Sequence, residues 1–125
     1  MKQSEIELFN LDSAEGGIFR QLAEGMTTTI FPGEKAMLSV VRIEPNMKGE
    51  MHNHPEEQWG VMLEGSATRY QDDVEFEIKK GDFWRTPPNA MHAMKAGPEG
   101  AVVLDVFAPV RADYLKAGSG FASTD

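Results

Sequence analysis

Short apolar runs, many of them rich in β-branched residues, recur along the chain between turn-forming residues. Breaks fall at Pro32-Gly33, Pro45-Asn46 and Gly97-Pro98, among other places. Many short strands with such punctuation are typical of a β-sandwich or a β-barrel. Helical periodicity is weak except near residues 111–118, so the pattern predicts an all-β fold. The apolar runs are TTTIF, AMLSVVRIE, WGVMLE, SATRYQ, EFEIK, DFWRTP and AVVLDVFAP.

Length and composition favour one domain with one core, since the chain has 125 residues and is 41% hydrophobic. No apolar run approaches the roughly 18 residues that a membrane span requires, and the opening stretch MKQSEIELFN is too polar for a signal peptide. The absence of cysteine excludes disulfides, zinc–thiolate sites and a cysteine nucleophile. We therefore expect a cytoplasmic protein without a membrane segment.

The chain carries a formal net charge of −8, from 20 acidic and 12 basic residues spread along its length. An acidic surface repels a phosphate backbone, and no cluster of lysine and arginine offsets it, so we expect no nucleic-acid partner. The same field opposes a small anionic ligand. Binding of such a ligand would therefore depend on particular arginines.

The main chemical motif is EMHNHPEEQWGVMLEG, residues 50–65. His52 and His54 are two positions apart, and on a strand this spacing places both side chains on one face, roughly 6.6 Å apart. Two such imidazoles can converge on one ion at about 2.0–2.1 Å. Gln58 opens the next apolar run, and His92 follows another proline-rich turn. Because all three histidines of the chain fall into one strand-turn pattern, the sequence predicts a metal site.

Residues 46–65 and 81–92 resemble the two sequence motifs of the cupin superfamily. The first family motif runs glycine, five residues, His-x-His, three or four residues, glutamate, six residues, glycine. The second runs glycine, five residues, Pro-x-Gly, two residues, histidine. At these spacings the chain has Asn46, His52, His54, Gln58 and Gly65, and then Gly81, Pro87, Asn89 and His92. Asparagine replaces glycine twice, which is tolerable because asparagine also adopts positive φ.

The resemblance implies a jelly-roll β-barrel, in a single domain, that holds one divalent metal ion. Cupins commonly bind the ion through three histidines and a carboxylate, and the register of the motif places a glutamine at the fourth position here. Glu56 and Glu57 are nearby carboxylates that could compete, although on a strand Glu57 would point away from the face of Gln58. The implied ligands are His52, His54, Gln58 and His92.

A glutamine ligand is neutral and leaves the ion its full double charge. Such an ion is a stronger Lewis acid toward hydroxyl, carboxylate or enolate oxygens. Cycling to a trivalent state should be less favourable than with a carboxylate ligand. This favours non-redox chemistry with Zn²⁺, Ni²⁺, Mn²⁺ or Fe²⁺, among which an imidazole-rich site does not choose. An oxygenase stays open as an alternative.

A second group of candidates lies in AVVLDVFAPVRADYL, residues 101–115. Asp105 shares a strand face with Val103 and Phe107, and if that face looks inward, the carboxylate enters a poorly solvated cavity near the ion. Burial would raise the pKa of Asp105 and the ion would lower it, which could leave the group poised for proton transfer. Arg111 follows six residues later and could grip a substrate carboxylate through its planar fork.

Together with HNHPEEQWGVMLEG, the pattern of Asp105, Phe107 and Arg111 resembles the small cupins of pectin and alginate degradation. Those proteins convert 4,5-unsaturated monouronates, the last products of polysaccharide lyases, into open-chain keto sugars. The resemblance implies an enzyme for a small anionic substrate, with catalytic Asp105 and Arg111. Substrate contacts would come from Phe107, Arg111 and Gly60, whose missing side chain would leave room beside the ion. Arg69 is a spare anion-binding candidate, with surface placement favoured.

Two other functions stay open at this point. One is an iron-dependent dioxygenase or an isomerase of another small oxygenated acid, and the other is a cupin that binds a metal and a metabolite without turnover. The resemblance also implies a homodimer with contacts in the N-terminal strands, residues 1–30, and a candidate interface at residues 18–31. The barrel is expected over residues 31–115, followed by a mobile tail at 116–125.

Overall fold

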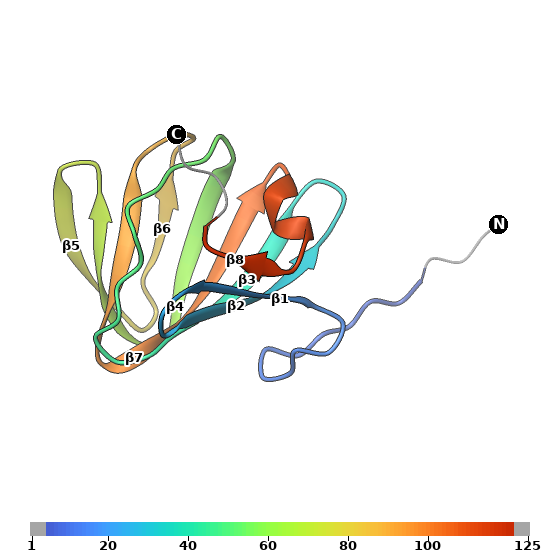
Figure 1. Cartoon of the computed structure of the whole chain (residues 1–125), viewed down its shortest axis with the longest axis horizontal. Coiled ribbons are helices and arrows are strands. Elements are labelled where there is room, and N and C mark those ends of the chain that lie inside the picture. Colours follow the sequence, from blue (N-terminus) through green and yellow to red (C-terminus); the bar gives the residue numbers. More distant parts are fainter. Residues whose placement is uncertain (1–4, 122–125) are drawn as a thin grey trace.

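A computed structural model describes residues 5–121, which form a curved β-sheet wrapped around one core (Figure 1). The described residues contain eight strands and one short 3₁₀-helix, which confirms the predicted all-β fold. The elements are β1 Ile18–Ala23, β2 Met26–Pro32, β3 Met37–Ile43, β4 Glu57–Gln71, β5 Val74–Lys79, β6 Phe83–Thr86, β7 His92–Ala108, η1 Ala112–Leu115 and β8 Gly118–Ser119. The only helical turn among them falls where the sequence shows its one hint of helical periodicity.

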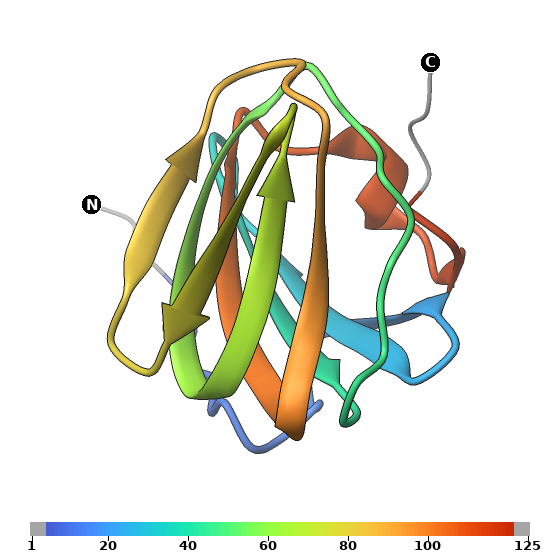
Figure 2. The ribbon, with the colours of Figure 1, turned by 90° about the vertical axis from the view of Figure 1, so that its left-hand side faces the viewer.

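The sheet follows the order β5-β4-β7-β3-β2-β1-β8, with β6 paired to β4 beside β5. Strand β4 lies against β7 along its whole length, while its other edge pairs first with β6 and then with β5 (Figure 2). The β4–β7 ladder is interrupted by register shifts at Met62/Glu64 and Gly65/Ala67. Such bulges bend both strands and turn the sheet around the core.

The bend in β4 requires glycine at Gly65, which has a φ of +83°. A side chain at this position would collide with the carbonyl oxygen of Gly100, on the neighbouring turn of β7. Gly65 is also the closing glycine of the first sequence motif. The motif therefore marks a backbone crossing that only glycine fits.

The two asparagines that stand at motif glycines both have left-handed backbones. Asn46 has a φ of 64° and Asn89 a φ of 68°, while Gly81 has a φ of 95°. Asparagine tolerates this region better than most residues because its side chain can hydrogen-bond locally. The prediction that these substitutions preserve the turns is confirmed.

The core lies on the concave side of the sheet, where alternate residues of the strands point inward. Ile30 is fully buried and Met62 is 1% exposed. Burial of a side chain of this size stabilises the fold by about 1.5–3 kcal/mol. The core includes Leu22, Met26, Ile30, Met37, Val41, Ile43, Met62, Ala67, Ile78, Trp84, Met94, Ala96, Val103, Phe107 and Tyr114.

The chain ends differ from the expectation on the C-terminal side. Residues 116–121 are expected to be mobile, but β8 pairs in parallel with β1 and Phe121 packs against the core. Residues 122–125 lie outside the described residues. On the N-terminal side, β1 and β2 join the main sheet, and residues 5–17 precede it without a strand.

None of the helical structure within residues 5–121 has the length and apolar character needed to cross a membrane.

Candidate metal centre

The three histidines lie on two segments that meet at the cavity enclosed by the sheet. His52 and His54 belong to the connection between β3 and β4, and His92 begins β7. The main chains of His52 and His92 exchange two hydrogen bonds, at 3.0 and 2.9 Å. The segment of His52 and His54 is thus an extended loop bridged to β7, rather than the regular strand that the sequence suggests. The bridge brings together residues forty positions apart.

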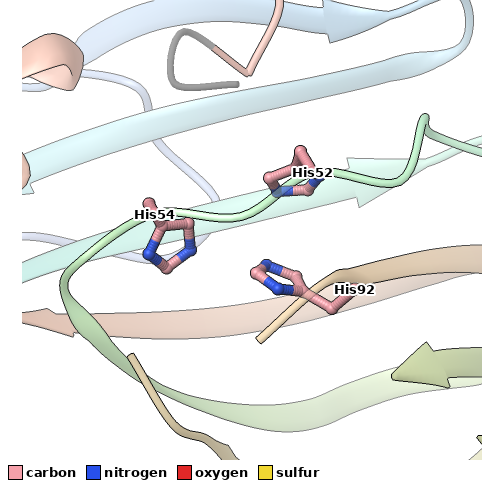
Figure 3. Close-up of side chains that lie close together, drawn as sticks. All are labelled: His52, His54 and His92. Atoms are coloured by element: carbon pink, nitrogen blue, oxygen red, sulfur yellow. The ribbon is translucent and has the colours of Figure 1, made fainter. Parts of the chain in front are cut away.

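The imidazole rings surround one common space (Figure 3). Ring centroids are 4.4 Å apart for His52 and His92, 5.0 Å for His54 and His92, and 6.1 Å for His52 and His54. One ligand atom from each residue lies within 4.8 Å of the others. Ring nitrogens bind divalent ions at about 2.0–2.1 Å, so a set this close together fits a single ion.

Backbone carbonyls orient all three rings. The Nδ1 atom of His52 lies 2.9 Å from the oxygen of Glu50, that of His54 lies 3.1 Å from the oxygen of Glu56, and that of His92 lies 2.8 Å from the oxygen of Ala90. Since a carbonyl oxygen only accepts, each Nδ1 must donate, and this fixes the tautomer. The Nε2 lone pairs are then free to bind a metal, and His92 Nε2 is buried without a hydrogen-bond partner.

Gln58 completes the set at the start of β4, where its side chain is buried. Its Oε1 atom lies 2.9 Å from His54 Nε2. In the tautomer assigned above both atoms are acceptors, and a cation bound by both would stabilise this contact. Two ligands at right angles around an ion at about 2.1 Å are about 3.0 Å apart, which matches the observed distance. The four side chains therefore fit the divalent ion that the sequence predicts.

Burial keeps the histidines neutral, as metal binding requires. It lowers the pKa of His52 and of His54 from 6.5 to about 4, and the positive charge of Arg111 adds to the effect on both. Burial also lowers the pKa of His92 to about 2, with a further contribution from Arg69. At neutral pH the three histidines are already deprotonated at the nitrogen that would bind a cation, so binding would release no protons from them.

The two competing carboxylates point away from the common space. Glu57 accepts hydrogen bonds from Arg85 and from Trp59 on the outer face of β4, as the strand alternation predicts. The Glu56 carboxylate lies 3.6 Å from Nδ1 of His54, on the far side of the ring from the metal-binding nitrogen. Glu56 is placed to polarise His54 rather than to bind the ion.

Asp105 lies on β7 with its side chain in the same cavity, between Val103 and Phe107 as predicted. Its Oδ1 atom is buried and has no hydrogen-bond partner. Burial raises the pKa of Asp105 from 3.8 to about 6, against the opposing effects of Arg69, the Gln58 side chain and Arg111. A carboxyl group with this pKa can both accept and release a proton near neutral pH.

The interaction between Gln58 and Asp105 gives a physical reason for the neutral ligand. An amide offers an oxygen to a metal and keeps N–H donors for a neighbouring carboxylate. A glutamate at position 58 would put a second negative charge beside Asp105 and would raise its pKa further. Gln58 therefore contacts both the histidine cluster, through His54, and the Asp105 carboxylate.

Arg111 follows β7 and is 1% exposed. Its guanidinium carbon lies 4.0 Å from the ring centroid of Tyr114 and 5.6 Å from that of Phe107. Nη2 donates to the carbonyl oxygen of Phe121, while Nε and Nη1 are buried without partners. Phe107 also packs edge-on against His54, at 5.3 Å between centroids, so it holds Arg111 and the metal site together.

Arg69 is a correction to the sequence analysis, which favoured the surface for it. The residue lies on β4, is 3% exposed and lines the cavity. Its Nη2 donates to Thr86 Oγ1 at 2.6 Å, while Nε has no partner. Burial lowers its pKa to about 10, and Asp105 opposes this shift. The period-two alternation that buries Ala67 and Arg69 on one face was the signal that could have revealed it.

Gly60 faces inward, but its missing side chain makes room for a different neighbour from the one that the sequence suggested. A Cβ atom at this position would lie 2.5 Å from the Trp84 indole, which covers it from β6. The space beside Gly60 is thus filled by protein. A direct contact between Gly60 and a substrate stays a prediction without support from this packing.

The cavity itself is small, with a volume of about 40 Å³. A water molecule needs about 10–15 Å³ by this measure, so the space holds an ion with about two or three waters. Its lining includes residues that the sequence analysis did not place there, among them Arg69, Tyr114 and Phe121.

Comparison with known proteins agrees with the motifs. Residues 39–107 match a family model described as Cupin domain. The chain is 27% identical over 99 residues to the pectin degradation protein KdgF of Dickeya dadantii, which covers 78% of this chain and 90% of that protein. It is 32% identical over 103 residues to oxalate decarboxylase OxdC of Bacillus subtilis. That match covers 74% of this chain but only 25% of the decarboxylase, so the chain spans about a quarter of that relative.

Solved structures share the fold. A cupin of the RmlC-like type from Shewanella frigidimarina gives a TM-score of 0.75 at 24% identity, over 91% of this chain and 99% of that chain. KdgF from a Halomonas species gives a TM-score of 0.70 at 23% identity, over 76% of this chain and 90% of that chain. An oxalate decarboxylase of Bacillus subtilis, described as having Mn(II) centres, gives a TM-score of 0.71 at 25% identity, over 78% of this chain and 28% of that chain.

Proposed function

The chain belongs to the cupin family, and we propose that it is a metal-dependent enzyme that opens and ketonises 4,5-unsaturated monouronates. The observation that carries the proposal is the carboxyl of Asp105, whose Oδ1 is buried without a hydrogen-bond partner, in the cavity beside three histidines and a glutamine. The similarity to a pectin degradation protein over most of both chains supports the substrate class.

The metal would be held by His52, His54, His92 and Gln58. When bound, a divalent ion supplies Lewis acidity toward the substrate oxygens. Zn²⁺, Ni²⁺, Mn²⁺ and Fe²⁺ all suit this ligand set. The three Nδ1 hydrogen bonds to backbone carbonyls keep the histidines in place before any ligand arrives.

Asp105 carries the proton in this proposal. The ionised carboxylate removes the proton of the anomeric hydroxyl, the bond between C1 and the ring oxygen breaks, and an aldehyde forms at C1. The electron pair of that bond leaves an enolate at C5, still joined to C4 by the ring double bond. Protonated Asp105 then delivers its proton to C4, and a ketone forms at C5. A pKa of about 6 suits a group that must act in both directions.

The substrate carboxylate is bonded to C5, next to the oxygen on which charge develops. Arg111 has two buried nitrogen atoms without hydrogen-bond partners, Nε and Nη1, and Arg69 has one, Nε. Guanidinium groups bind carboxylates through charge-assisted hydrogen bonds, often in pairs. We assign Arg111 to the carboxylate and Arg69 to the same negative region, where it also opposes the raised pKa of Asp105.

The homodimer also stays a proposal, which rests on the family resemblance and on exposed apolar side chains. Phe19 on β1 is 54% exposed and Leu38 on β3 is 41% exposed. Both face away from the core. Light scattering on the purified protein distinguishes a dimer from a monomer.

The test is to mix the metal-loaded protein with an unsaturated monouronate made by an exolyase. Loss of the ultraviolet absorbance of the C4=C5 bond is followed against time and corrected for spontaneous decay, and NMR identifies the product. We expect acceleration that Asp105→Asn abolishes. Asp73→Asn, on the exposed turn between β4 and β5, is the matched control and should leave the rate unchanged.

Three outcomes would contradict the proposal. If the metal-loaded protein does not accelerate the loss of absorbance, the ketonisation reaction is excluded. Oxygen consumption by the iron-loaded protein with another small acid would indicate a dioxygenase. A binding protein would be indicated if the uronate raised the melting temperature of the wild type and of Asp105→Asn alike, and neither protein converted the uronate.

A further inference from the structure

The segment after η1, residues 116–121, returns to the edge of the sheet, where β8 lies beside β1 (Figure 1). Gly118 and Ser119 form β8, which pairs with Arg20 and Gln21 of β1. The amide of Gly120 donates to the carbonyl of Gln21 at 2.8 Å. The segment is attached to the barrel mainly through its backbone.

One buried arginine holds this segment. Arg20 Nε donates to the carbonyl oxygen of Gly120 at 2.7 Å, and Nη2 donates to that of Ser119 at 2.8 Å. Nη1 reaches the carbonyl oxygens of Lys116 at 3.3 Å and Asp113 at 3.5 Å. A single side chain on β1 thus binds backbone from η1 to the end of β8.

The segment ends on the metal site. The Phe121 ring stacks on the imidazole of His52, with centroids 4.1 Å apart and ring planes 23° apart. Gly49 lies beneath the ring, and a Cβ atom there would be 2.7 Å from Phe121 Cζ. The carbonyl oxygen of Phe121 accepts a hydrogen bond from Arg111 Nη2. One residue therefore covers a metal ligand with its ring and an anion-binding group with its carbonyl.

This arrangement leaves no room for a sugar. The cavity of about 40 Å³ has Phe121 as part of its wall, whereas pockets for small molecules are usually about 300–1,000 Å³. Something in the wall must move before a ring the size of a uronate can enter. The strands of the barrel are fixed by ladders of hydrogen bonds, but residues 116–121 are attached by one short parallel pairing, by hydrogen bonds from Arg20 and Arg111 to backbone carbonyls, and by the Phe121 stack.

We propose that residues 116–121 form a cover over the metal cavity, and that Phe121 controls entry to it. With the cover closed, the Phe121 ring shields His52 and its carbonyl oxygen occupies Arg111. A ligand carboxylate takes the place of that carbonyl on Arg111 when the cover opens. The identity of that ligand as a uronate rests on the proposed function, while the cover itself does not.

The first test measures metal release and needs no substrate. The Co²⁺-loaded protein is mixed with excess EDTA, and loss of the Co²⁺ spectrum is followed by stopped flow. Phe121→Ala and Arg20→Gln should release the ion about threefold to tenfold faster, the factor that corresponds to the loss of an aromatic contact. Phe121→Leu should stay near the wild-type rate because it retains an apolar cover.

Phe83→Ala is the control, since Phe83 is an exposed aromatic, 69% accessible, on the outer face of β6. It should leave the release rate unchanged. Metal stoichiometry should be the same in all of these proteins, which separates a cover from a ligand. Equal release rates in the wild type, Phe121→Ala and Arg20→Gln would overturn the proposal.

A second measurement addresses ligand entry. If the uronate is turned over, Phe121→Ala should change KM by a larger factor than kcat, because loss of the ring stacked on His52 loosens the segment whose backbone carbonyl competes with the substrate for Arg111. An unchanged KM would overturn the competition at Arg111. If no uronate is turned over, faster metal release would still support the cover while the proposed reaction failed.

Discussion

The two halves of the cavity differ in how their polar atoms are satisfied. In the metal half, a backbone carbonyl orients every imidazole through Nδ1, and the unpartnered ring nitrogen is the one on His92 that an ion would take. In the other half, Asp105, Arg69 and Arg111 all keep buried atoms without hydrogen-bond partners. Each such atom costs the fold about 1–3 kcal/mol unless a ligand or water satisfies it.

The comparison indicates separate tasks for the two halves. Neutral side chains fixed by the backbone suit an ion that remains bound. Charged side chains with unused hydrogen-bonding capacity suit a polar ligand that arrives and leaves. Gln58 touches both halves, since its oxygen faces His54 and its side chain interacts with Asp105.

The largest effect should come from the metal half. His92→Ala removes a ligand, so we expect metal affinity to fall by more than about 100-fold, the upper end of what a lost outer partner of a ligand costs. Turnover should disappear with the metal. Titration with Zn²⁺ against a competing chelator gives the affinity.

Lys95→Ala lies on the same strand, at an exposed position, and controls for damage to β7. If His92→Ala bound the metal as tightly as the control, His92 would not be a ligand and the metal half would need another definition.

In the other half, Arg111→Lys should leave metal binding unchanged and weaken substrate binding. Lysine keeps the charge but loses the planar fork. Loss of a charge-assisted hydrogen bond of about 1.5–3 kcal/mol corresponds to an increase in KM of roughly 10-fold to 100-fold. Steady-state kinetics and metal analysis of the same sample provide the check. Loss of metal in this variant would mean that the two halves are not separate.

Gln58→Glu should act on both halves in opposite directions. A carboxylate should bind the ion more tightly, and it should also raise the pKa of the neighbouring Asp105 through repulsion. We expect a higher metal affinity, a turnover reduced by about tenfold at neutral pH, and a low-pH limb of the rate profile shifted upward. A rate profile identical to that of the wild type would argue against any contact between Gln58 and Asp105 in the working enzyme.

The smallest effect concerns the metal-free protein. Burial lowers the pKa of His52 and His54 from 6.5 to about 4, so the folded state binds fewer protons than the unfolded state between these values. The stabilisation is complete above pH 6.5 and is lost as the pH falls toward 4. Asp105 works in the opposite direction, because its raised pKa favours the folded state as it gains a proton.

Urea unfolding of the metal-free protein at several pH values measures the sum of these effects. His92→Gln removes one buried histidine whose pKa is lowered to about 2. The pH dependence should therefore be shallower in His92→Gln than in the wild type. Equal slopes would mean that His92 gains its proton as easily in the folded protein as in the unfolded chain.

The metal half could be predicted from the sequence because its information is local. His52, His54 and Gln58 lie within one short motif, and the turns of the motifs are marked by residues that tolerate positive φ, such as Asn46 and Asn89. Asp105 could be predicted because a charged residue interrupts an apolar strand at an inward position. The histidine spacing and the place of Asp105 are read from the residues themselves, whereas Gln58 as the fourth ligand and the turn positions are read from the resemblance to the cupin motifs.

Arg69 and the cover could not be predicted in the same way. Alternation with Ala67 hints at an inward face for Arg69, but its burial depends on the shape of the sheet and on Thr86 from β6. The sequence GSGFASTD resembles a flexible tail, yet Arg20, nearly a hundred residues earlier, binds the backbone of residues 116–120. Contacts between backbone carbonyls and a distant side chain leave no pattern in the residues that supply the carbonyls.

The most direct test of the separation between the halves is metal content and turnover measured together on Asp105→Asn. Asparagine has nearly the same shape as aspartate but cannot carry the proton. We predict one bound ion per chain, as in the wild type, and a turnover lower by about 100-fold to 10,000-fold. Loss of the ion, or turnover at the wild-type rate with the ion bound, would contradict the account.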